Sequence, residues 1–373
     1  MQPTEKDFKL AKIFIHHSLQ LKPKEKLLIT TSDSGAFPLV KASFIEALKV
    51  GAFPIIDTQI DMLINRSFMS GFQYQFYKHA NDWQLHHVPH ELMEGKVNWA
   101  DAYLRIYSID NTKELTQIPS EKILLRNKLM RPYLDKIVDS DRWLLTYYPT
   151  PAMAQEAGMS FDALVDFYYN ACIVDYTKME QDLKKLETVL DKGKQVHIVG
   201  DKTDLTFSIE GRLAKAAYGE RNIPDGEVFL APVHTTVEGH VYFEFPSQAY
   251  GTEVEGIYLE FKKGKIVKAV AEKGQKALEK IIKTDEGSHY LGELGVGANY
   301  NIQNGMNNTL FDEKIGGTVH LAVGHCYREK RGGSLEGNTK SAIHWDIVKD
   351  MRKKGSVLMI DGKAIMKEGK FLI

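Results

Sequence analysis

The sequence predicts an α/β N-terminal domain with a mostly parallel sheet, followed by an α+β C-terminal domain with antiparallel strands. Three observations support this prediction. Short apolar runs alternate with helical patterns in the first half, a long helical segment follows, and the hydrophobic period then changes to two. The 373 residues also exceed the roughly 150 typical of one domain. We therefore expect two domains, residues 1–190 and 191–373.

Four short runs in the first half are rich in aliphatic and aromatic residues and are bounded by Gly, Pro or Asp, as strands are. Helix formers with apolar residues at a spacing of three to four lie between them, over Lys41–Val50 and Glu121–Lys136. This alternation predicts parallel pairing, because each helix returns the chain to the start of the next strand. The expected strands are Leu27–Thr31, Phe53–Asp57, Tyr103–Ile109 and Trp143–Tyr148.

The segment from Ser160 to Lys192 has helical spacing, with Ser160 as its expected N-cap and Gly193 at its end. We expect it to bridge the two domains. Beyond it, Lys262–Lys265 is expected to form the turn of a hairpin, and Glu272–Ile282 one further helix. The expected C-terminal strands are Val196–Val199, Leu205–Ile209, Gly239–Phe245, Gly256–Phe261 and Ile266–Val270.

Composition excludes several classes of function. The 48 Lys and Arg residues nearly balance the 49 Asp and Glu residues, whereas nucleic-acid binding usually needs a basic excess. Cys172 and Cys326 fit no disulfide or zinc pattern, which is typical of a reducing compartment. The N-terminus lacks the apolar region of a signal peptide, and no run approaches the ~18 apolar residues of a membrane span. We expect a soluble cytoplasmic protein that binds neither nucleic acid nor membrane.

Two segments place histidines on the polar face of an expected strand. In Ser341–Val348, strand alternation would put His344 and Asp346 together on the face opposite Trp345. In Thr318–Gly324, the same alternation leaves His320 alone on the polar face. Taken singly, each segment is also compatible with an ordinary strand that has a solvated face.

Two further segments place acids beside turn-forming glycines. The turn Pro224–Gly226 delivers Glu227 to the first position of an apolar strand. Glu293 lies in the run Leu291–Gly297, whose glycines permit close approach of another backbone. The acids of Phe311–Glu313 also come shortly before the second histidine segment, so one loop brings carboxylates within its reach.

Charge balance joins these segments into one hypothesis. Four acids supply four negative charges, which two divalent cations would neutralise, and buried carboxylates need such pairing. Two neutral histidines complete an oxygen and nitrogen ligand set suited to Zn²⁺, Co²⁺ or Mn²⁺. The pattern predicts a two-metal hydrolytic centre, in which ions about 3.5–4 Å apart hold and acidify a water. The expected ligands are Glu227, Glu293, Glu313, His320, His344 and Asp346.

At these residues the sequence resembles the thermophilic-type metalloaminopeptidases. The resemblance spans nearly the whole chain and is carried by five ordered motifs. It implies an exopeptidase that removes N-terminal residues from peptides with two divalent ions and works as a homodimer. The motifs are residues 224–232, 291–294, 310–313, 319–324 and 341–346.

The resemblance also implies roles for single residues. The six acids and histidines above correspond to the family's metal ligands, and Glu293 to its metal-bridging carboxylate. Tyr327 corresponds to a tyrosine that acts either as a ligand or in transition-state stabilisation. We expect Glu293 or Glu227 to accept the proton of the bridging water and Tyr327 to donate a hydrogen bond to the oxyanion.

Two alternatives remain open at this point. A mononuclear iron dioxygenase that cleaves rings on a related scaffold needs two histidines and one carboxylate, and the three glutamates beyond Asp346 argue against it. A non-catalytic binding protein would need no aligned acids. A separate histidine cluster at His86–Glu91 is expected to form a surface loop, because Pro89 breaks the helix that an HExxH zinc site requires.

Overall fold

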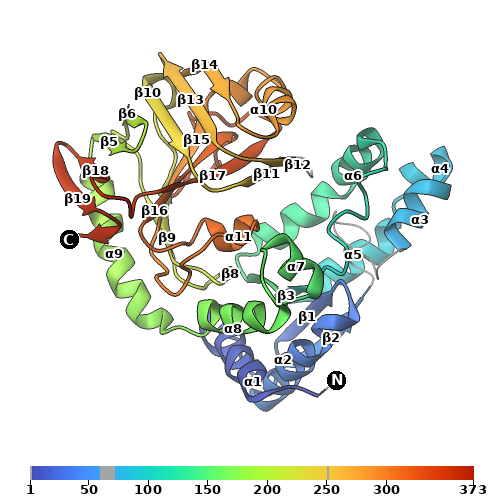
Figure 1. Cartoon of the computed structure of the whole chain (residues 1–373). Helices are drawn as coiled ribbons and strands as arrows, with labels where there is room; N and C mark the ends of the chain where they lie inside the picture. Colours follow the sequence, from blue (N-terminus) through green and yellow to red (C-terminus); the bar gives the residue numbers. More distant parts are fainter. Residues whose placement is uncertain (1, 59–71, 250–251) are drawn as a thin grey trace. The chain divides into compact units, whose positions relative to one another are not determined.

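The computed structural model of the chain describes residues 2–58, 72–249 and 252–373 (Figure 1). Its internal contacts form two compact units. The N-terminal unit comprises residues 1–174 and 219–223, and the C-terminal unit comprises residues 175–218 and 224–373. The domains expected from the sequence were residues 1–190 and 191–373. That boundary places nearly all of the helical segment ending at Lys192 in the first domain, whereas residues 175–192 lie in the C-terminal unit.

The N-terminal unit contains a five-stranded sheet in the order β2-β1-β3-β4-β8, and every pair of neighbours is parallel. This confirms the parallel sheet predicted from the alternating pattern. The two-residue edge strand β8 comes from later in the chain and directly precedes the turn at Pro224. The strands are β1 (Lys26–Thr31), β2 (Phe53–Asp57), β3 (Ala102–Tyr107), β4 (Trp143–Tyr147) and β8 (Asn222–Ile223).

Helices pack against this sheet. Leu28 of β1 and Tyr103 of β3 pack with residues of α5 and α6 in one apolar cluster, whereas α2 contacts β1 and β2. The predicted helices over 41–50 and 121–136 are confirmed as α2 and α6, whereas α3, α4, α5 and α7 were not predicted. The helices are α1 (Glu5–Lys12), α2 (Phe37–Lys49), α3 (Phe72–His79), α4 (Asp82–His86), α5 (His90–Trp99), α6 (Ser120–Asp139) and α7 (Pro151–Glu156), with a π-helix at Ile13–Ser18.

The helical segment from Ser160 to Lys192 forms two helices, α8 (Phe161–Cys172) and α9 (Tyr176–Lys192). Ser160 caps α8 as predicted, because its hydroxyl accepts a hydrogen bond from Ala163 N at 3.2 Å. Asp175 caps α9 in the same way, accepting from Lys178 N at 3.0 Å. A second N-cap therefore interrupts the pattern, and α9 belongs to the C-terminal unit.

The C-terminal unit contains two large antiparallel sheets. The predicted hairpin is confirmed as β13 and β14, and the predicted helix is confirmed as α10 (Gln275–Ile282). The eight-stranded sheet has the order β14 (Lys265–Val270), β13 (Ile257–Lys262), β10 (Glu238–Phe243), β6 (Thr203–Ser208), β5 (Gln195–Gly200), β18 (Val357–Ile360), β19 (Lys363–Lys367) and β20 (Lys370–Phe371). The five-stranded sheet has the order β17 (His344–Asp350), β16 (Thr318–Gly324), β15 (Leu291–Gly297), β9 (Glu227–Leu230) and β7 (Lys215–Ala217). A two-stranded ribbon joins β11 (Ser247–Ala249) to β12 (Thr252–Val254).

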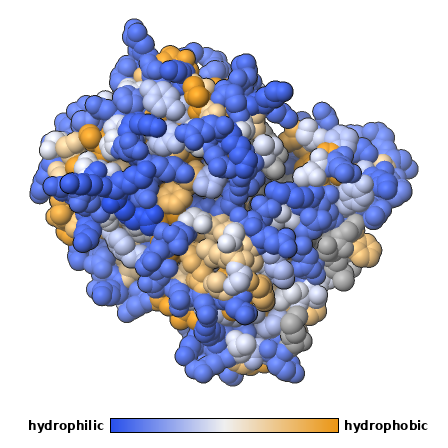
Figure 2. Space-filling view, in the orientation of Figure 1, coloured by the Kyte–Doolittle hydropathy of each residue, from blue (hydrophilic) through white to orange (hydrophobic). Residues whose placement is uncertain are grey.

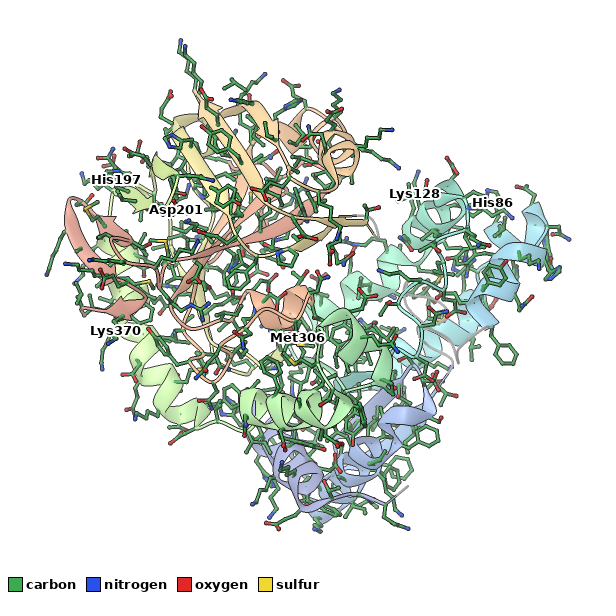
Figure 3. The ribbon with its side chains drawn as sticks, viewed as in Figure 1. His86, Lys128, His197, Asp201, Met306 and Lys370 are labelled. Atoms are coloured by element: carbon green, nitrogen blue, oxygen red, sulfur yellow. The ribbon has the colours of Figure 1, made fainter. Side chains whose placement is uncertain are left out.

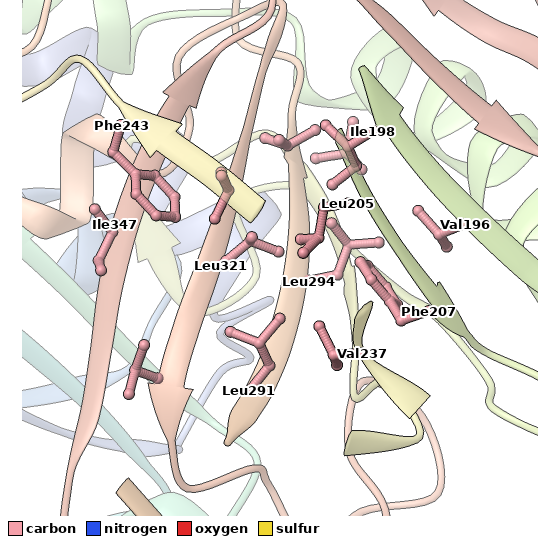
Figure 4. Packing of buried hydrophobic residues seen from close by; sticks show 14 of the residues in the cluster. Val196, Ile198, Leu205, Phe207, Val237, Phe243, Leu291, Leu294, Leu321 and Ile347 are labelled. Carbon is pink, nitrogen blue, oxygen red and sulfur yellow. The ribbon is translucent and has the colours of Figure 1, made fainter. Parts of the chain in front are cut away.

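The core of the C-terminal unit lies between its two large sheets (Figure 4). Leu205 and Phe207 of the eight-stranded sheet pack in one cluster with Leu294, Leu321 and Ile347 of the five-stranded sheet. Because side chains alternate along each strand, one face of the five-stranded sheet packs in the core and the other face can carry polar side chains.

Hydrophilic residues cover most of the face shown in Figure 2, with smaller hydrophobic areas among them. In the described ranges, no helix combines the length and the apolar character that crossing a bilayer requires. Both cysteines, Cys172 and Cys326, are buried and neither forms a disulfide with a described residue.

Candidate metal centre

Four neighbouring strands carry acids and histidines on the face of the five-stranded sheet opposite the core. Glu227 begins β9, Glu293 lies in β15, His320 in β16, and His344 and Asp346 in β17. Their chain neighbours Val228, Leu294, Leu321, Trp345 and Ile347 are members of the apolar core.

The expected turn before Glu227 is present. Gly226 has a φ of 129°, a backbone conformation that favours glycine, and β9 begins at the next residue. Asn299 holds this turn, since its Nδ2 donates to Asp225 O at 2.9 Å. The turn thus delivers the Glu227 carboxylate to the edge of the polar face.

A β-bulge places Glu293 on the polar face. Leu291 pairs with Val323 and Glu293 with Ala322, so the register shifts at Gly292. Leu291 and Leu294 both reach the core although they lie three positions apart. The bulge therefore lets two core leucines flank a carboxylate that points the other way.

Gly295 makes room for the imidazole of His320. The two residues are cross-strand partners, and a Cβ at position 295 would lie 2.0 Å from His320 Cε1 and 2.1 Å from its Nε2. Any side chain at this position would displace the ring. Gly292 and Gly297 allow the predicted close approach of backbone, since a Cβ there would lie 2.3 Å from the carbonyl oxygens of His325 and Ile315, whereas Gly295 admits a side chain.

Glu293, His320 and Asp346 form the tightest group of candidate ligands. One ligand atom from each lies within 4.8 Å of the other two. His320 Nε2 lies 3.3 Å from Glu293 Oε1 and 3.4 Å from Glu227 Oε2, and its side chain is 0% exposed. A single ion could therefore bind atoms contributed by three strands.

The donor set fits a divalent cation. Glu227 Oε2, Glu293 Oε2 and Asp346 Oδ1 are buried, and no described residue gives any of them a hydrogen bond. Unpaired buried carboxylate oxygens are costly unless a cation satisfies them. Carboxylate and imidazole ligands together suit Zn²⁺, Co²⁺ or Mn²⁺.

His344 is oriented as a ligand by a backbone carbonyl. Its Nδ1 donates a hydrogen bond to His325 O at 2.6 Å, which leaves Nε2 as the ligand atom. That Nε2 lies 3.3 Å from Asp346 Oδ1. The predicted pairing of His344 and Asp346 on one strand face is therefore present in the structure.

The ionisation of these groups shows excess negative charge. Burial, reinforced by the carboxylates of Asp346 and Glu227, raises the pKa of Glu313 to about 8. Burial also raises the pKa of Glu293. Although burial opposes the charged imidazole, Glu293 and Glu227 raise the pKa of His320 to about 9. The positive groups of the protein therefore do not neutralise the negative charge of the buried carboxylates at this centre.

Glu313 contacts a lysine that the sequence analysis did not assign to the centre. It follows the short helix α11 (Thr309–Asp312), and its Oε2 accepts a hydrogen bond from Lys314 Nζ at 2.7 Å. The same Nζ donates to Glu227 Oε1, also at 2.7 Å, and the Lys314 side chain is 1% exposed. The only signal in the sequence is that this lysine directly follows a candidate ligand.

Asp312, the other acid of the α11 segment, has a structural role. Its carboxylate accepts hydrogen bonds from Met306 N at 2.8 Å and Asn308 N at 3.1 Å, although burial raises its pKa to about 7. Figure 3 labels Met306 on the segment beside α11. These bonds fix the loop that leads to Glu313.

The ring of Tyr327 lies beside His344, while burial of its hydroxyl and the carboxylates of Glu293 and Asp346 raise the pKa of the tyrosine. Its ring centroid is 5.6 Å from that of His344 and 6.0 Å from that of Phe229, and the residue is 48% exposed. The tyrosine can therefore meet a bound molecule from the accessible side. A cavity also opens on the centre, lined in part by Ser247, Gln248, Asn307, Thr309, Glu313 and Asp346.

The histidine cluster at 86–90 has a different structure. Helix α4 ends at His86 and α5 begins at His90 after Pro89, so the two histidines do not share a helix face. His86 Nδ1 contacts Asp82 O at 2.8 Å, and Figure 3 labels His86 at the end of α4. The break predicted at Pro89 is confirmed.

Comparison with known proteins identifies the family of the chain. Residues 4–371 match the family described as thermophilic metalloprotease (M29). Aminopeptidase T from Thermus aquaticus is 26% identical, with 99% of each chain covered. Aminopeptidase 2 from Geobacillus stearothermophilus is 28% identical over 77% of this chain and 80% of that one. Aminopeptidase AmpS from Bacillus subtilis is 34% identical over 45% and 46%.

The fold agrees as well. The solved structure of wild-type AmpT from Thermus thermophilus superposes with a TM-score of 0.83, at 24% identity and 99% coverage of both chains. This likeness confirms the predicted combination of a parallel and an antiparallel α/β architecture. The family match also confirms the resemblance found in the sequence.

Proposed function

This chain belongs to the thermophilic metalloprotease (M29) family and is a metal-dependent aminopeptidase, and we propose that two divalent ions bound on the five-stranded sheet serve its reaction. The observation that carries the proposal is the set of three buried carboxylate oxygens, on Glu227, Glu293 and Asp346, that receive no hydrogen bond from the described residues. Glu227 and Glu293 lie within 3.4 Å of His320 Nε2, and Asp346 lines a cavity together with Glu313.

The ligands we propose come from the four strands and the α11 loop. Glu293, His320 and Asp346 would hold one ion, and Glu293 is the proposed bridging carboxylate. Zn²⁺, Co²⁺ and Mn²⁺ are the proposed metals because the donors are oxygen and nitrogen. Such ions supply Lewis acidity, which lowers the pKa of a water and polarises a scissile carbonyl. The further proposed ligands are Glu227, Glu313 and His344.

Two kinds of side chain would move or hold protons. Glu293 or Glu227 accepts the proton of the attacking water, and both have a buried carboxylate oxygen positioned beside His320. Tyr327 donates a hydrogen bond to the tetrahedral oxyanion, since its ring lies beside His344 and the raised pKa of its hydroxyl keeps the proton in place.

The substrates we propose are peptides with a free N-terminal amine. A free amine would be able to bind one of the two ions or a nearby carboxylate, whereas an acylated amine would do neither. Beside the acids, the cavity is lined by the uncharged polar side chains of Ser247, Gln248, Asn307 and Thr309.

The ring-cleaving dioxygenase alternative is not favoured. A mononuclear iron site of that kind uses two histidines and one carboxylate, whereas Glu227, Glu293 and Glu313 join Asp346 at this centre. The family match also points to peptide hydrolysis.

We further propose a homodimer in the cytoplasm. The two buried cysteines, which form no disulfide with a described residue, are compatible with a reducing compartment. Light scattering on the purified protein tests the dimer, since a particle with the mass of one chain would contradict it.

The test of the function uses chelated protein. Aminoacyl-anilides should be hydrolysed only after Zn²⁺, Co²⁺ or Mn²⁺ is added back, and the same anilides with an acetylated amine should not be hydrolysed. Failure of all three metals to restore activity would contradict the proposal. Equal cleavage of acetylated substrates would exclude an exopeptidase.

A further inference from the structure

A buried ammonium group occupies one side of the candidate centre. Lys314 Nζ lies 2.7 Å from Glu227 Oε1 and 2.7 Å from Glu313 Oε2, and its side chain is 1% exposed. Both carboxylates belong to the proposed ligand set. The positive charge therefore binds two of the groups that a second metal ion would need.

The lysine changes the charge balance of the centre. Glu227, Glu293, Glu313 and Asp346 supply four negative charges, and Lys314 reduces the excess to three. One divalent ion then leaves one negative charge, whereas two leave one positive charge in a buried site. With the ammonium in place, the second ion meets one net negative charge instead of two, so the electrostatic attraction for it is weaker.

Glu227 divides the centre into two unequal sides. Its Oε1 accepts a hydrogen bond from Lys314, while its Oε2 faces His320 Nε2 at 3.4 Å and has no hydrogen-bond partner among the described residues. One oxygen is thus committed to the ammonium, and the other remains available on the side of Glu293 and Asp346.

Lys314 cannot leave without cost. Its backbone is held on both sides, since Lys314 N donates to Phe311 O at 3.1 Å and Lys314 O accepts from Asn299 N at 2.9 Å. A buried ammonium that loses both carboxylates keeps a large desolvation cost. An ion that binds Glu227 Oε1 and Glu313 Oε2 must overcome this cost.

We propose that the Lys314 ammonium serves as a built-in cation of the metal centre, so that one divalent ion binds tightly at Glu293, His320 and Asp346 and the second binds weakly. The inference rests on the proposed function and deepens it. It makes the centre asymmetric, with a permanent ion and an exchangeable one.

Another buried lysine in the same sheet provides a matched control. Lys349 of β17 is 0% exposed, and its Nζ lies 2.6 Å from Glu244 Oε1. It also donates to the backbone oxygen of Asp201, which Figure 3 labels. Replacing it removes a buried lysine that pairs with a carboxylate without touching a proposed ligand, and Glu244 keeps Lys353 Nζ at 3.2 Å.

The experiment titrates the chelated full-length chain with Zn²⁺ alone, by calorimetry and by native mass spectrometry, which counts bound ions. In the wild type we expect one tight ion and a second whose affinity is at least about tenfold weaker. Lys314→Met should tighten the second ion by at least about tenfold. Lys349→Met should bind ions as the wild type does.

Any other result contradicts either the inference about Lys314 or the proposed function. Two ions bound with equal affinity by the wild type, or a second ion no tighter in Lys314→Met, would overturn the inference and leave the proposed function standing. No ion bound by the wild type would overturn both. If Lys314→Met does not fold, Lys314→Gln is used in its place. The wild-type titration still shows whether the two ions bind with unequal affinity.

Discussion

His320 and Gly295 face each other across β16 and β15, and the imidazole occupies the volume that a Cβ on residue 295 would fill. The ring is held there with Nε2 within 3.4 Å of carboxylates on two other strands. The position of a metal ligand thus depends on the absence of one side chain.

Gly295→Ala should abolish tight metal binding while preserving the fold. The new methyl group would lie about 2 Å from the ring, so His320 must leave its place between Glu227 and Glu293. We expect Zn²⁺ affinity and kcat/KM to fall by at least about a hundredfold, in line with the loss of a correctly placed ligand.

Gly95→Ala is the matched control. This glycine lies inside α5, and a Cβ there meets no atom within 4 Å. The variant should keep full activity and gain about 0.5–1 kcal/mol in the free energy of unfolding. Wild-type Zn²⁺ affinity in Gly295→Ala would show that the ring does not need this space.

Glu293→Gln should reduce turnover of aminoacyl-anilides by at least about a hundredfold. The amide keeps the shape of the side chain but cannot accept a proton or supply a negative charge to a metal. Glu260→Gln on β13 of the eight-stranded sheet makes the same change away from the centre and should have no effect. Substantial remaining turnover in Glu293→Gln would remove Glu293 from the mechanism.

Strand alternation made much of this site predictable. Trp345 and Ile347 lie in the core, and His344 and Asp346 lie together on the other face, as the period of two indicated. Cross-strand register was not predictable, because the placing of Glu293 depends on a bulge at Gly292 that no local pattern marks. The sequence could identify the acids as candidate ligands but could not show which of them lie close together in the fold.

The role of Lys314 was missed for a related reason. The charge balance counted acids alone, because a lysine after a helix is normally solvated. Only the folded loop after α11 shows that Lys314 is buried between Glu227 and Glu313. Short strands such as β18 were missed because their pairing with β5 lies more than 150 positions away in the sequence.

Metal should stabilise the protein against heat. A ligand that binds only the folded state adds about 2.7 kcal/mol at a concentration of 100 Kd, and each kcal/mol shifts Tm by roughly 2–4 °C for 150–250 residues. We therefore expect Zn²⁺ to raise the Tm of the C-terminal unit by about 5–10 °C relative to chelated protein. Asp346→Asn should lose most of this shift, and an unchanged wild-type Tm would argue that no ion relieves the buried carboxylates.

Asp285 should stabilise the segment that enters β17 in a pH-dependent way. Its carboxylate accepts hydrogen bonds from Ala342 N at 2.7 Å, Ser341 Oγ at 2.9 Å and Ser288 N at 2.8 Å. Burial opposes the charged form, but these bonds outweigh it and hold the pKa of Asp285 below the usual 3.8. Hence Asp285→Asn should reduce the free energy of unfolding by about 1.5–3 kcal/mol at neutral pH.

The sign of the pH dependence follows from the lowered pKa. A carboxylate with a lower pKa in the folded state contributes its full stability above the pKa of the unfolded chain, and this contribution is lost as the pH falls through the folded value. The difference between wild type and Asp285→Asn should therefore be constant from pH 7 to about pH 5 and shrink below about pH 4. Urea unfolding at several pH values measures it. A difference that grows toward acid would mean that the Asp285 carboxylate is not the group that anchors Ser341 and Ala342 ahead of His344.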